Sequence, residues 1–305
     1  MKKEHSMAPE LVSNIQRFSL DDGPGIRTTV FMKGCNLRCA WCHNPESLNM
    51  SPILQFAAQN CASCGKCVAV CPNGAQRLEG DTHIFDRALC KACGKCASVC
   101  RKSALKLIGR MYEPDELFLE LIKDRAYFKT GGGVTFSGGE PALKPDFIRE
   151  TARLCREDGI HTALDTAGNV PFANYDRVLP HISLFLFDVK CFTSALHKRW
   201  TQVENGLILE NLRKLDAAGA EYTIRVPVIP SFNDDLQEQE RIARFIASLS
   251  RPGLVELLPY HTYGVGKYDA LGIAYDYAQY ASPHDEIMEE ALHCYLQLGL
   301  NARIS

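Results

Sequence analysis

The sequence has no large excess of charge of either sign. Its 34 Lys and Arg residues are nearly balanced by 36 Asp and Glu residues, which leaves a formal net charge of -2. Proteins that bind the phosphate backbone of nucleic acids usually carry an excess of basic residues. The balanced charge of this sequence shows no such excess. We therefore expect no nucleic-acid partner.

The sequence also lacks a long apolar segment. No uninterrupted apolar run approaches the roughly 18 residues that suggest a membrane span. Residues 1–6 contain two lysines with no apolar signal segment behind them, so a secreted, disulfide-bonded protein is not favoured. We expect a soluble cytoplasmic protein with no membrane partner, and its 46% hydrophobic residues are enough to bury a substantial core.

Cysteine, by contrast, is abundant, with 14 residues. Three of them, Cys155, Cys191 and Cys294, stand alone, and we expect them to pack in the interior because free cysteine is among the most buried residue types. The other eleven fall into three groups, which in a cytoplasmic protein indicate metal ligands rather than disulfides. The groups are Cys35, Cys39 and Cys42; Cys61, Cys64, Cys67 and Cys71; and Cys90, Cys93, Cys96 and Cys100.

The second and third groups share the pattern C-x2-C-x2-C-x3-C, which is typical of the bacterial ferredoxin run that binds [4Fe-4S] clusters. Pro72 completes this motif in the first copy, whereas Arg101 replaces the proline in the second. In such pairs the fourth cysteine of each run ligates the other cluster. A pair of structural zinc sites is the alternative, but zinc ligands usually come as two separated C-x2-C pairs. The predicted quartets are Cys61, Cys64, Cys67 and Cys100, and Cys90, Cys93, Cys96 and Cys71.

The first group, C-x3-C-x2-C, supplies only three thiolates. If Cys35, Cys39 and Cys42 hold a [4Fe-4S] cluster, one iron lacks a protein ligand and can accept an exchangeable one. The alternative is a zinc site completed by His43. Because His43 directly follows Cys42, it would need a cramped turn to reach the same ion.

This group, with Trp41 just before its last cysteine, resembles the signature of radical S-adenosylmethionine (SAM) enzymes. The preceding residues 22–34, DGPGIRTTVFMKG, are similar to those of the glycyl-radical enzyme activating enzymes. The two ferredoxin-like runs after the first group resemble an insert found in the larger members of that family. Matching segments run from Asn14 to about Tyr268.

The rest of the chain alternates apolar strand-like and helix-like segments, which predicts an α/β fold with a parallel sheet. Helices are predicted at 114–128 and 145–158, and six strands at 28–33, 134–136, 161–165, 183–189, 222–228 and 254–258. The resemblance implies a partial (β/α)6 TIM-like barrel with an inserted ferredoxin-like domain. We expect a flexible N-terminus at 1–13, the barrel at 14–51 and 109–305, and the insert at 52–108.

Polar residues follow these strands, where the reactive groups of such barrels gather. Taken alone, they also suit turns, solvated strand ends or ordinary ion pairs, and we read Gly131 to Gly133 as a flexible entry loop. The resemblance implies that SAM chelates the open iron held by Cys35, Cys39 and Cys42. It places Gly138, Gly139 and Glu140 on the SAM amino group, Lys190 and Arg225 near its carboxylate, His261 on the adenosyl group, Trp41 with the cofactor, Asp165 and Asp188 around a monovalent cation, and Asp22 on a partner's glycine loop.

The expected activity is that of an anaerobic oxidoreductase. It would cleave SAM reductively to a 5'-deoxyadenosyl radical and take a hydrogen atom from a glycine Cα of a partner glycyl radical enzyme. Two alternatives are a radical SAM enzyme that acts on a small molecule and a non-catalytic iron-sulfur electron carrier. We expect three [4Fe-4S] clusters, a flavodoxin or ferredoxin as electron donor, and a monomer. The two insert clusters would relay electrons or form a scaffold for docking the partner.

Overall fold

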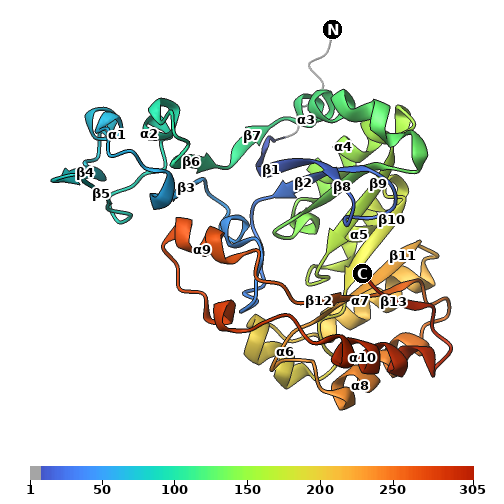
Figure 1. The fold of residues 1–305 in the computed structure, drawn as a ribbon. Helices are drawn as coiled ribbons and strands as arrows, with labels where there is room; N and C mark the ends of the chain where they lie inside the picture. Colours follow the sequence, from blue (N-terminus) through green and yellow to red (C-terminus); the bar gives the residue numbers. More distant parts are fainter. Residues whose placement is uncertain (1–7) are drawn as a thin grey trace, which may run out of the picture.

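A curved sheet forms the wall of a partial barrel in the computed structural model, which describes residues 8–305 (Figure 1). Its strands are β1 (Glu10–Ser19), β2 (Arg27–Met32), β7 (Arg110–Tyr112), β8 (Gly133–Gly138), β9 (His161–Thr166), β10 (Leu184–Asp188), β11 (Tyr222–Val228), β12 (Val255–Pro259) and β13 (Ala302–Ile304). Within the described residues the order of the nine strands is β13-β12-β11-β10-β9-β8-β2-β1-β7. Neighbours from β2 to β13 run parallel, as the sequence predicts.

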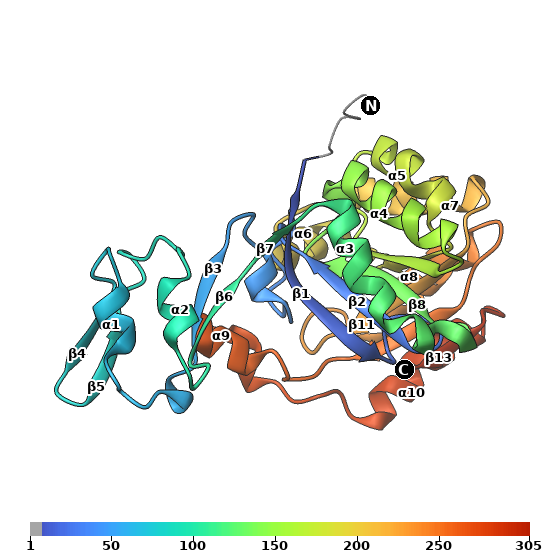
Figure 2. The same cartoon turned by 90° about the horizontal axis from the view of Figure 1, so that it is seen from above.

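The six predicted strands are confirmed as β2 and β8 to β12, with ends that differ by no more than two residues. Helices cover the outer face of the sheet, so these strands are buried on both sides (Figure 2). The predicted helix at 145–158 is confirmed as α4, whereas the one at 114–128 ends early and continues as a 3-10 helix, Ile122–Thr130. The covering helices are α3 (Pro114–Leu121), α4 (Pro145–Glu157), α5 (Phe172–Val178), α6 (Ser194–Thr201), α7 (Gly206–Ala217), α8 (Leu236–Ala247) and α10 (Asp285–Leu296).

The sheet is wider than the six predicted strands. Strand β1 pairs antiparallel with β2 on one side and with β7 on the other, while β13 extends the opposite edge. The flexible N-terminus expected at 1–13 is therefore too long, because residues 10–13 belong to a paired strand. Residues 1–7 lie outside the described residues.

One large hydrophobic cluster lies between the sheet and its helices. It includes fully buried side chains such as Phe136, Tyr175 and Phe187. Cys155 also belongs to it, while Cys191 packs in a neighbouring aromatic cluster with Trp41. Cys294 is half-buried against the main core. The packing role predicted for these three isolated cysteines is thus confirmed.

The insert projects beside the barrel (Figures 1 and 2). It begins and ends in an antiparallel pair of strands, β3 (Ile53–Phe56) and β6 (Leu105–Ile108). Between them lie two short helices, α1 (Lys66–Val70) and α2 (Lys95–Val99), and a hairpin of β4 (Gln76–Glu79) and β5 (Thr82–Phe85). The insert has its own small cluster of buried residues, which consists of Leu54, Leu105, Cys67 and Cys96.

Of the glycines at 131–133, Gly132 and Gly133 are packed tightly against neighbouring backbone, whereas Gly131 has open space around it. A Cβ on Gly132 would lie 2.0 Å from the carbonyl oxygen of Ile26, and one on Gly133 would lie 2.0 Å from that of His161. The entry-loop interpretation is therefore wrong for Gly132 and Gly133, where only the absence of a side chain permits this close approach. Among residues 8–305, no helix is both long and apolar enough to cross a membrane.

Candidate active site

A cavity of about 1120 Å3 lies inside the barrel. Residues from the carboxyl ends of the strands line it together with the loop that follows β2, as expected for a barrel active site. The predicted site residues that the cavity brings together are Asp22, Cys35, Cys39, Trp41, Cys42, Gly138, Gly139, Asp165, Asp188, Lys190, Arg225 and His261.

The loop that carries Cys35, Cys39 and Cys42 is held in place mainly by backbone contacts. Its amide groups at Arg38 and Ala40 donate to carbonyl oxygens near the end of α6, at 2.9 and 3.0 Å. Trp41 is buried and packs on Phe232, with ring centroids 4.5 Å apart. The packing of Trp41 thus fixes the position of the cysteine loop at the wall of the cavity.

The sulfur atoms of this loop already accept hydrogen bonds. The amides of Leu37 and Asn44 donate to the sulfurs of Cys35 and Cys42, each at 3.4 Å. Burial raises the pKa of Cys35 and Cys39 to about 12, which makes the thiolate costly without a bound cation. Three soft sulfur donors whose ionisation requires such a cation suit an iron-sulfur cluster.

A further helix, α9 (Val265–Leu271), which was not predicted from the sequence, holds the end of the cysteine loop. The Lys267 ammonium donates to the carbonyl oxygen of His43 at 3.0 Å and pairs with Glu46 at 2.8 Å. The Tyr268 hydroxyl donates to the carbonyl oxygen of Cys42 at 2.9 Å. On its other side, α9 accepts a hydrogen bond at Ala270 from the insert residue Arg87 at 2.7 Å. Helix α9 therefore joins the insert to the cysteine loop.

The Gly138-Gly139 pair lies directly against the backbone of β2 and of the loop that follows it. A Cβ on Gly139 would meet the carbonyl oxygen of Gly34 at 2.2 Å, and Gly138 has a φ of +112°. This close packing leaves backbone rather than side chains at the cavity surface, which suits contact with a ligand's amino group.

Glu140 does not line the cavity, contrary to the expectation that it binds SAM directly. Its side chain is 1% exposed, and its carboxylate accepts hydrogen bonds from the Thr166 hydroxyl at 2.8 Å and from the amides of Ala142 and Ala167 at 3.0 and 2.8 Å. Burial raises its pKa to about 7 despite these donors. Glu140 therefore joins the loops after β8 and β9 and is a positioning residue.

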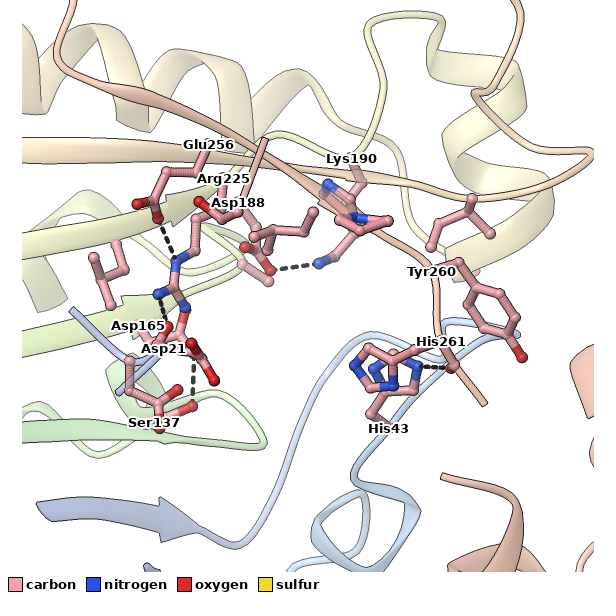
Figure 3. A pocket seen from close by; sticks show the side chains of 18 of the residues that line it. Asp21, His43, Ser137, Asp165, Asp188, Lys190, Arg225, Glu256, Tyr260 and His261 are labelled. Carbon is pink, nitrogen blue, oxygen red and sulfur yellow. Dashed lines mark hydrogen bonds and ion pairs between the residues drawn. The ribbon is translucent and has the colours of Figure 1, made fainter. Parts of the chain in front are cut away.

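Two carboxylates and two cations meet in the cavity, as Figure 3 shows. Lys190 donates to Asp188 at 2.6 Å, and Asp165 accepts a hydrogen bond from the Ser137 hydroxyl at 2.6 Å. Burial, together with the nearby charge of Asp188, raises the pKa of Asp165, although Arg225 opposes the shift. The two carboxylates that were predicted to hold a monovalent cation, those of Asp165 and Asp188, thus lie in the same part of the cavity.

Arg225 is almost completely buried and reaches several groups at once (Figure 3). Its guanidinium donates to the carbonyl oxygen of Asp21 and lies 3.9 Å from Asp165 and 3.5 Å from Glu256. The atom that faces Glu256 is Nε, which makes no hydrogen bond within residues 8–305 and is paired with this carboxylate by charge alone. Glu256, which sequence reasoning missed inside a predicted strand, also pairs with Arg303 at 2.5 Å.

His43 and His261 form a stacked pair at one end of the cavity (Figure 3). Their ring centroids are 3.9 Å apart, and Nε2 of His43 lies 2.9 Å from the carbonyl oxygen of His261. The His43 ring is therefore engaged with the end of β12. This placement leaves it poorly suited to complete the alternative zinc site, and the two flat rings suit contact with a planar base.

Asp22 is oriented by the strands on either side of it. Its carboxylate accepts hydrogen bonds from the hydroxyls of Ser19 at 2.5 Å and Thr29 at 2.7 Å. Arg27, with no exposed surface, supports the same turn by donating to the carbonyl oxygen of Pro24 at 3.0 Å and to the Thr135 hydroxyl at 2.6 Å. The glycine-rich turn is thus a rigid part of the cavity wall.

The insert cysteines surround a second, smaller cavity of about 180 Å3. It is lined by Cys61, Cys64, Cys67 and Cys100, which are the four members of one predicted quartet. Amides two residues further along donate to Cys61 and Cys90 at 3.4 Å, as in the barrel loop. The donor set and the cavity fit an iron-sulfur cluster held by thiolates from both runs.

A polar pair, which sequence reasoning missed, lies between the two quartets. His83 and Gln76 are both buried, and Nε2 of His83 lies 2.7 Å from the Gln76 side-chain oxygen. The same nitrogen lies 3.5 Å from the sulfur of Cys67, and the Gln76 amide donates to the sulfur of Cys96 at 3.8 Å. This pair therefore contacts a sulfur of each predicted quartet, with the Gln76 amide donating to Cys96 and the His83 ring lying beside Cys67.

Comparisons with known proteins agree with this site. A family model described as the radical SAM superfamily matches residues 29–246. The trans-4-hydroxy-L-proline dehydratase activating enzyme of Clostridioides difficile is 40% identical over 96% of this chain and 98% of its own. The benzylsuccinate synthase activating enzyme of Thauera aromatica is 42% identical over 88% of this chain and 83% of its own.

A solved structure is similar in fold alone. A radical SAM methyltransferase from Sphaerobacter thermophilus superposes with a TM-score of 0.55 over 92% of this chain and 66% of its own, at 14% identity. The predicted α/β class with a partial barrel is thereby confirmed.

Proposed function

We infer that this chain, which belongs to the activating enzymes of glycyl radical enzymes within the radical SAM superfamily, uses the barrel cavity to bring SAM and a partner's glycine together. Membership of the superfamily implies a [4Fe-4S] cluster and SAM. When bound, they supply a carbon radical strong enough to take a hydrogen atom from a glycine Cα. The chain's own residues bind, orient and exclude water.

One observation carries this proposal. The three-thiol loop faces a cavity of about 1120 Å3 that also contains Asp22, so a single space has room for SAM and for an entering peptide segment. Cys35, Cys39 and Cys42 would hold the cluster. A small-molecule substrate would not require Asp22 in the same cavity as the cysteines.

The SAM contacts follow from the positions of the polar groups. The backbone at Gly138 and Gly139 would receive the SAM amino group, and the guanidinium of Arg225, which lines the same cavity, would approach its carboxylate. Lys190 and His261 would contact the carboxylate region and the adenosyl group. The two carboxylates of Asp165 and Asp188 would hold a monovalent cation, since such cations prefer oxygen ligands.

The insert extends the proposal to the larger type of activating enzyme, with two further [4Fe-4S] clusters and three in all. Cys61, Cys64, Cys67 and Cys100 line one cavity, which supports the first quartet. Cys71 acts electrostatically on Cys96, and this proximity supports the second. A flavodoxin or ferredoxin would be the electron donor. A monomeric, cytoplasmic protein stays a prediction.

The proposal is tested by following the transfer of a hydrogen atom from the partner's glycine to 5'-deoxyadenosine, the product formed from SAM. The cluster-loaded protein is reduced under argon and incubated with SAM and a candidate glycyl radical enzyme whose glycines are deuterated at Cα. We expect one deuterium in 5'-deoxyadenosine and a glycyl doublet in the electron paramagnetic resonance (EPR) spectrum. Formation of 5'-deoxyadenosine without deuterium or doublet would favour a small-molecule substrate, and no 5'-deoxyadenosine at all would indicate an electron carrier.

A further inference from the structure

The small net charge of the chain hides an uneven distribution. Residues 52–108 contain eight basic and three acidic residues, a net charge of 8 − 3 = +5, so the remainder carries −2 − 5 = −7. The basic residues of the insert are Lys66, Arg77, Arg87, Lys91, Lys95, Arg101, Lys102 and Lys106, and the acidic ones are Glu79, Asp81 and Asp86.

Most of this positive charge is available at the surface. Arg77 pairs with Glu79 and Asp86, and Arg87 is directed to Leu54 and Ala270. The other six basic side chains are exposed and form no ion pair within residues 8–305: Lys66, Lys91, Lys95, Arg101, Lys102 and Lys106. Unpaired like charges repel one another, so a surface of this kind gains stability when an acidic partner covers it.

The basic residues surround the most exposed cysteines of both quartets. Cys64 and Cys93 are exposed, and each is followed by a glycine in the left-handed conformation and then by a lysine, Lys66 or Lys95, at the start of α1 or α2. Lys66, Arg101 and Lys102 line the 180 Å3 cavity. Figure 2 shows that α1 and the β4–β5 hairpin form the part of the insert farthest from the barrel.

We propose that this basic face, made by Lys66, Arg101 and Lys102 around Cys64, is the docking site of an acidic one-electron donor protein. The inference rests on the proposed function and extends it to the donor. One electron leaves the reduced donor for each SAM molecule cleaved, and the carbon-sulfur bond of the sulfonium accepts it as methionine is released. Encounters between redox proteins bury little surface and depend on charge for their speed.

The position of the face explains why the donor, rather than the glycyl radical enzyme, is its occupant. The glycine of the partner enzyme must reach the barrel cavity, whereas the basic face lies at the far end of the insert. A donor needs only to approach the exposed edge at Cys64. Rapid electron exchange also suits a complex held by surface charges, because such complexes form and separate quickly.

The test reverses these charges in the full, cluster-loaded chain. In the variant Lys66→Glu, Arg101→Glu and Lys102→Glu, SAM cleavage is followed against the concentration of photoreduced flavodoxin, an acidic donor. We expect the flavodoxin concentration for half-maximal rate to rise at least about tenfold at low salt, and its dependence on salt to flatten. The rate with dithionite and the iron content should equal those of the unmodified protein.

The control variant carries the same three charge reversals at exposed residues of the barrel helices, Lys198→Glu, Lys214→Glu and Arg244→Glu. It should leave the flavodoxin dependence within about twofold of the original. An equal effect of both variants, or none from the insert variant, would overturn the docking site. The docking site would also be overturned if the unmodified protein bound an RNA or DNA oligonucleotide tightly, and if the insert variant lost this binding but kept the original dependence on flavodoxin.

Two outcomes distinguish a failure of the donor docking site from a failure of the proposed function. If the unmodified protein cleaves no SAM even with dithionite, the proposed function itself fails. If the insert variant makes 5'-deoxyadenosine normally with flavodoxin but loses only glycyl radical formation, the face docks the glycyl radical enzyme and the donor site is disproved.

Discussion

The barrel and the insert both contain grouped cysteines, but the surroundings of the two groups differ. In the barrel, three thiols face a cavity of about 1120 Å3 that contains carboxylates, a lysine and an arginine. In the insert, four thiols enclose a space of about 180 Å3 in which Asp and Glu are absent among the described lining residues. A cluster with an incomplete ligand set and space beside it can bind a substrate, whereas a fully ligated one can only exchange electrons.

The two regions also differ in what stabilises them. The barrel has a large core of aliphatic and aromatic side chains. The fully buried cluster of the insert has four members, two of which are the cysteines Cys67 and Cys96. A domain of this size rarely folds on a hydrophobic core alone, so we expect the proposed clusters to stabilise the insert to a degree that the barrel does not need.

The largest effect should follow a change in the barrel loop. Replacing Cys39 with Ala leaves two thiolates for the open cluster, and we expect 5'-deoxyadenosine formation to fall to background with any reductant. About four iron atoms per chain should be lost, while the EPR signals of the insert clusters persist. The isolated Cys294→Ala variant serves as the control. Residual SAM cleavage near the original rate would contradict the assignment of the open cluster to this loop.

Removal of iron should separate the two regions next. Treatment with a chelator under oxidising conditions is expected to unfold the insert while the barrel keeps its secondary structure, because only the insert lacks an adequate apolar core. Hydrogen exchange followed by mass spectrometry measures this, with peptides from 57–104 losing protection and peptides from α4 and α8 retaining it. Equal loss of protection in both regions would show that the barrel depends on the clusters to the same extent.

A smaller effect is expected when the insert quartets are broken one ligand at a time. The double variant Cys64→Ala and Cys93→Ala should slow SAM cleavage several-fold with a flavodoxin donor, since both predicted insert clusters lose a thiolate. With dithionite the rate should stay near its original value, because a small reductant can reach the barrel directly. If both reductants give unchanged rates in a folded protein, the electron-relay role is wrong and the scaffold interpretation remains.

The smallest of these effects concerns Asp22 in the barrel cavity. Asp22→Asn keeps the size of the side chain and removes its charge, so we expect the concentration of partner enzyme for half-maximal activation to rise about twofold to threefold, because one charge-assisted hydrogen bond is weakened. The uncoupled cleavage of SAM should change little. Asp21→Asn is the matched neighbour, because the contact of Asp21 with Arg225 is made by its backbone. An unchanged requirement for partner would exclude Asp22 from the glycine-loop contact.

Sequence patterns predicted the parallel strands and the grouping of cysteines because both are local signals. Strand β10 begins with the continuous apolar run LFLF, and the cysteine spacing is short enough to be read directly. Strand β1 and strand β7 were missed because their alternation is irregular, and their stability comes from pairing with each other and with β2.

The residues missed at the site share a different cause. Lys267, Arg87 and Glu256 act on groups far away in the sequence, and nothing near them in the chain signals these contacts. Glu140 shows the converse, since its motif was recognised but its carboxylate serves the neighbouring loop rather than the cavity. Spacing therefore located the site, and only tertiary structure assigned each side chain its neighbours.

The strand pair at the base of the insert has a consequence for how such proteins arise. Phe56 and Leu105 are register partners, and the amide of Ala57 donates to the carbonyl oxygen of Ala104 at 2.8 Å, so the chain leaves the barrel and returns to it at a single point. A short hairpin turn could replace residues 57–104 without moving either flanking strand. Gain or loss of the entire insert along a lineage would then require only one recombination event at this junction.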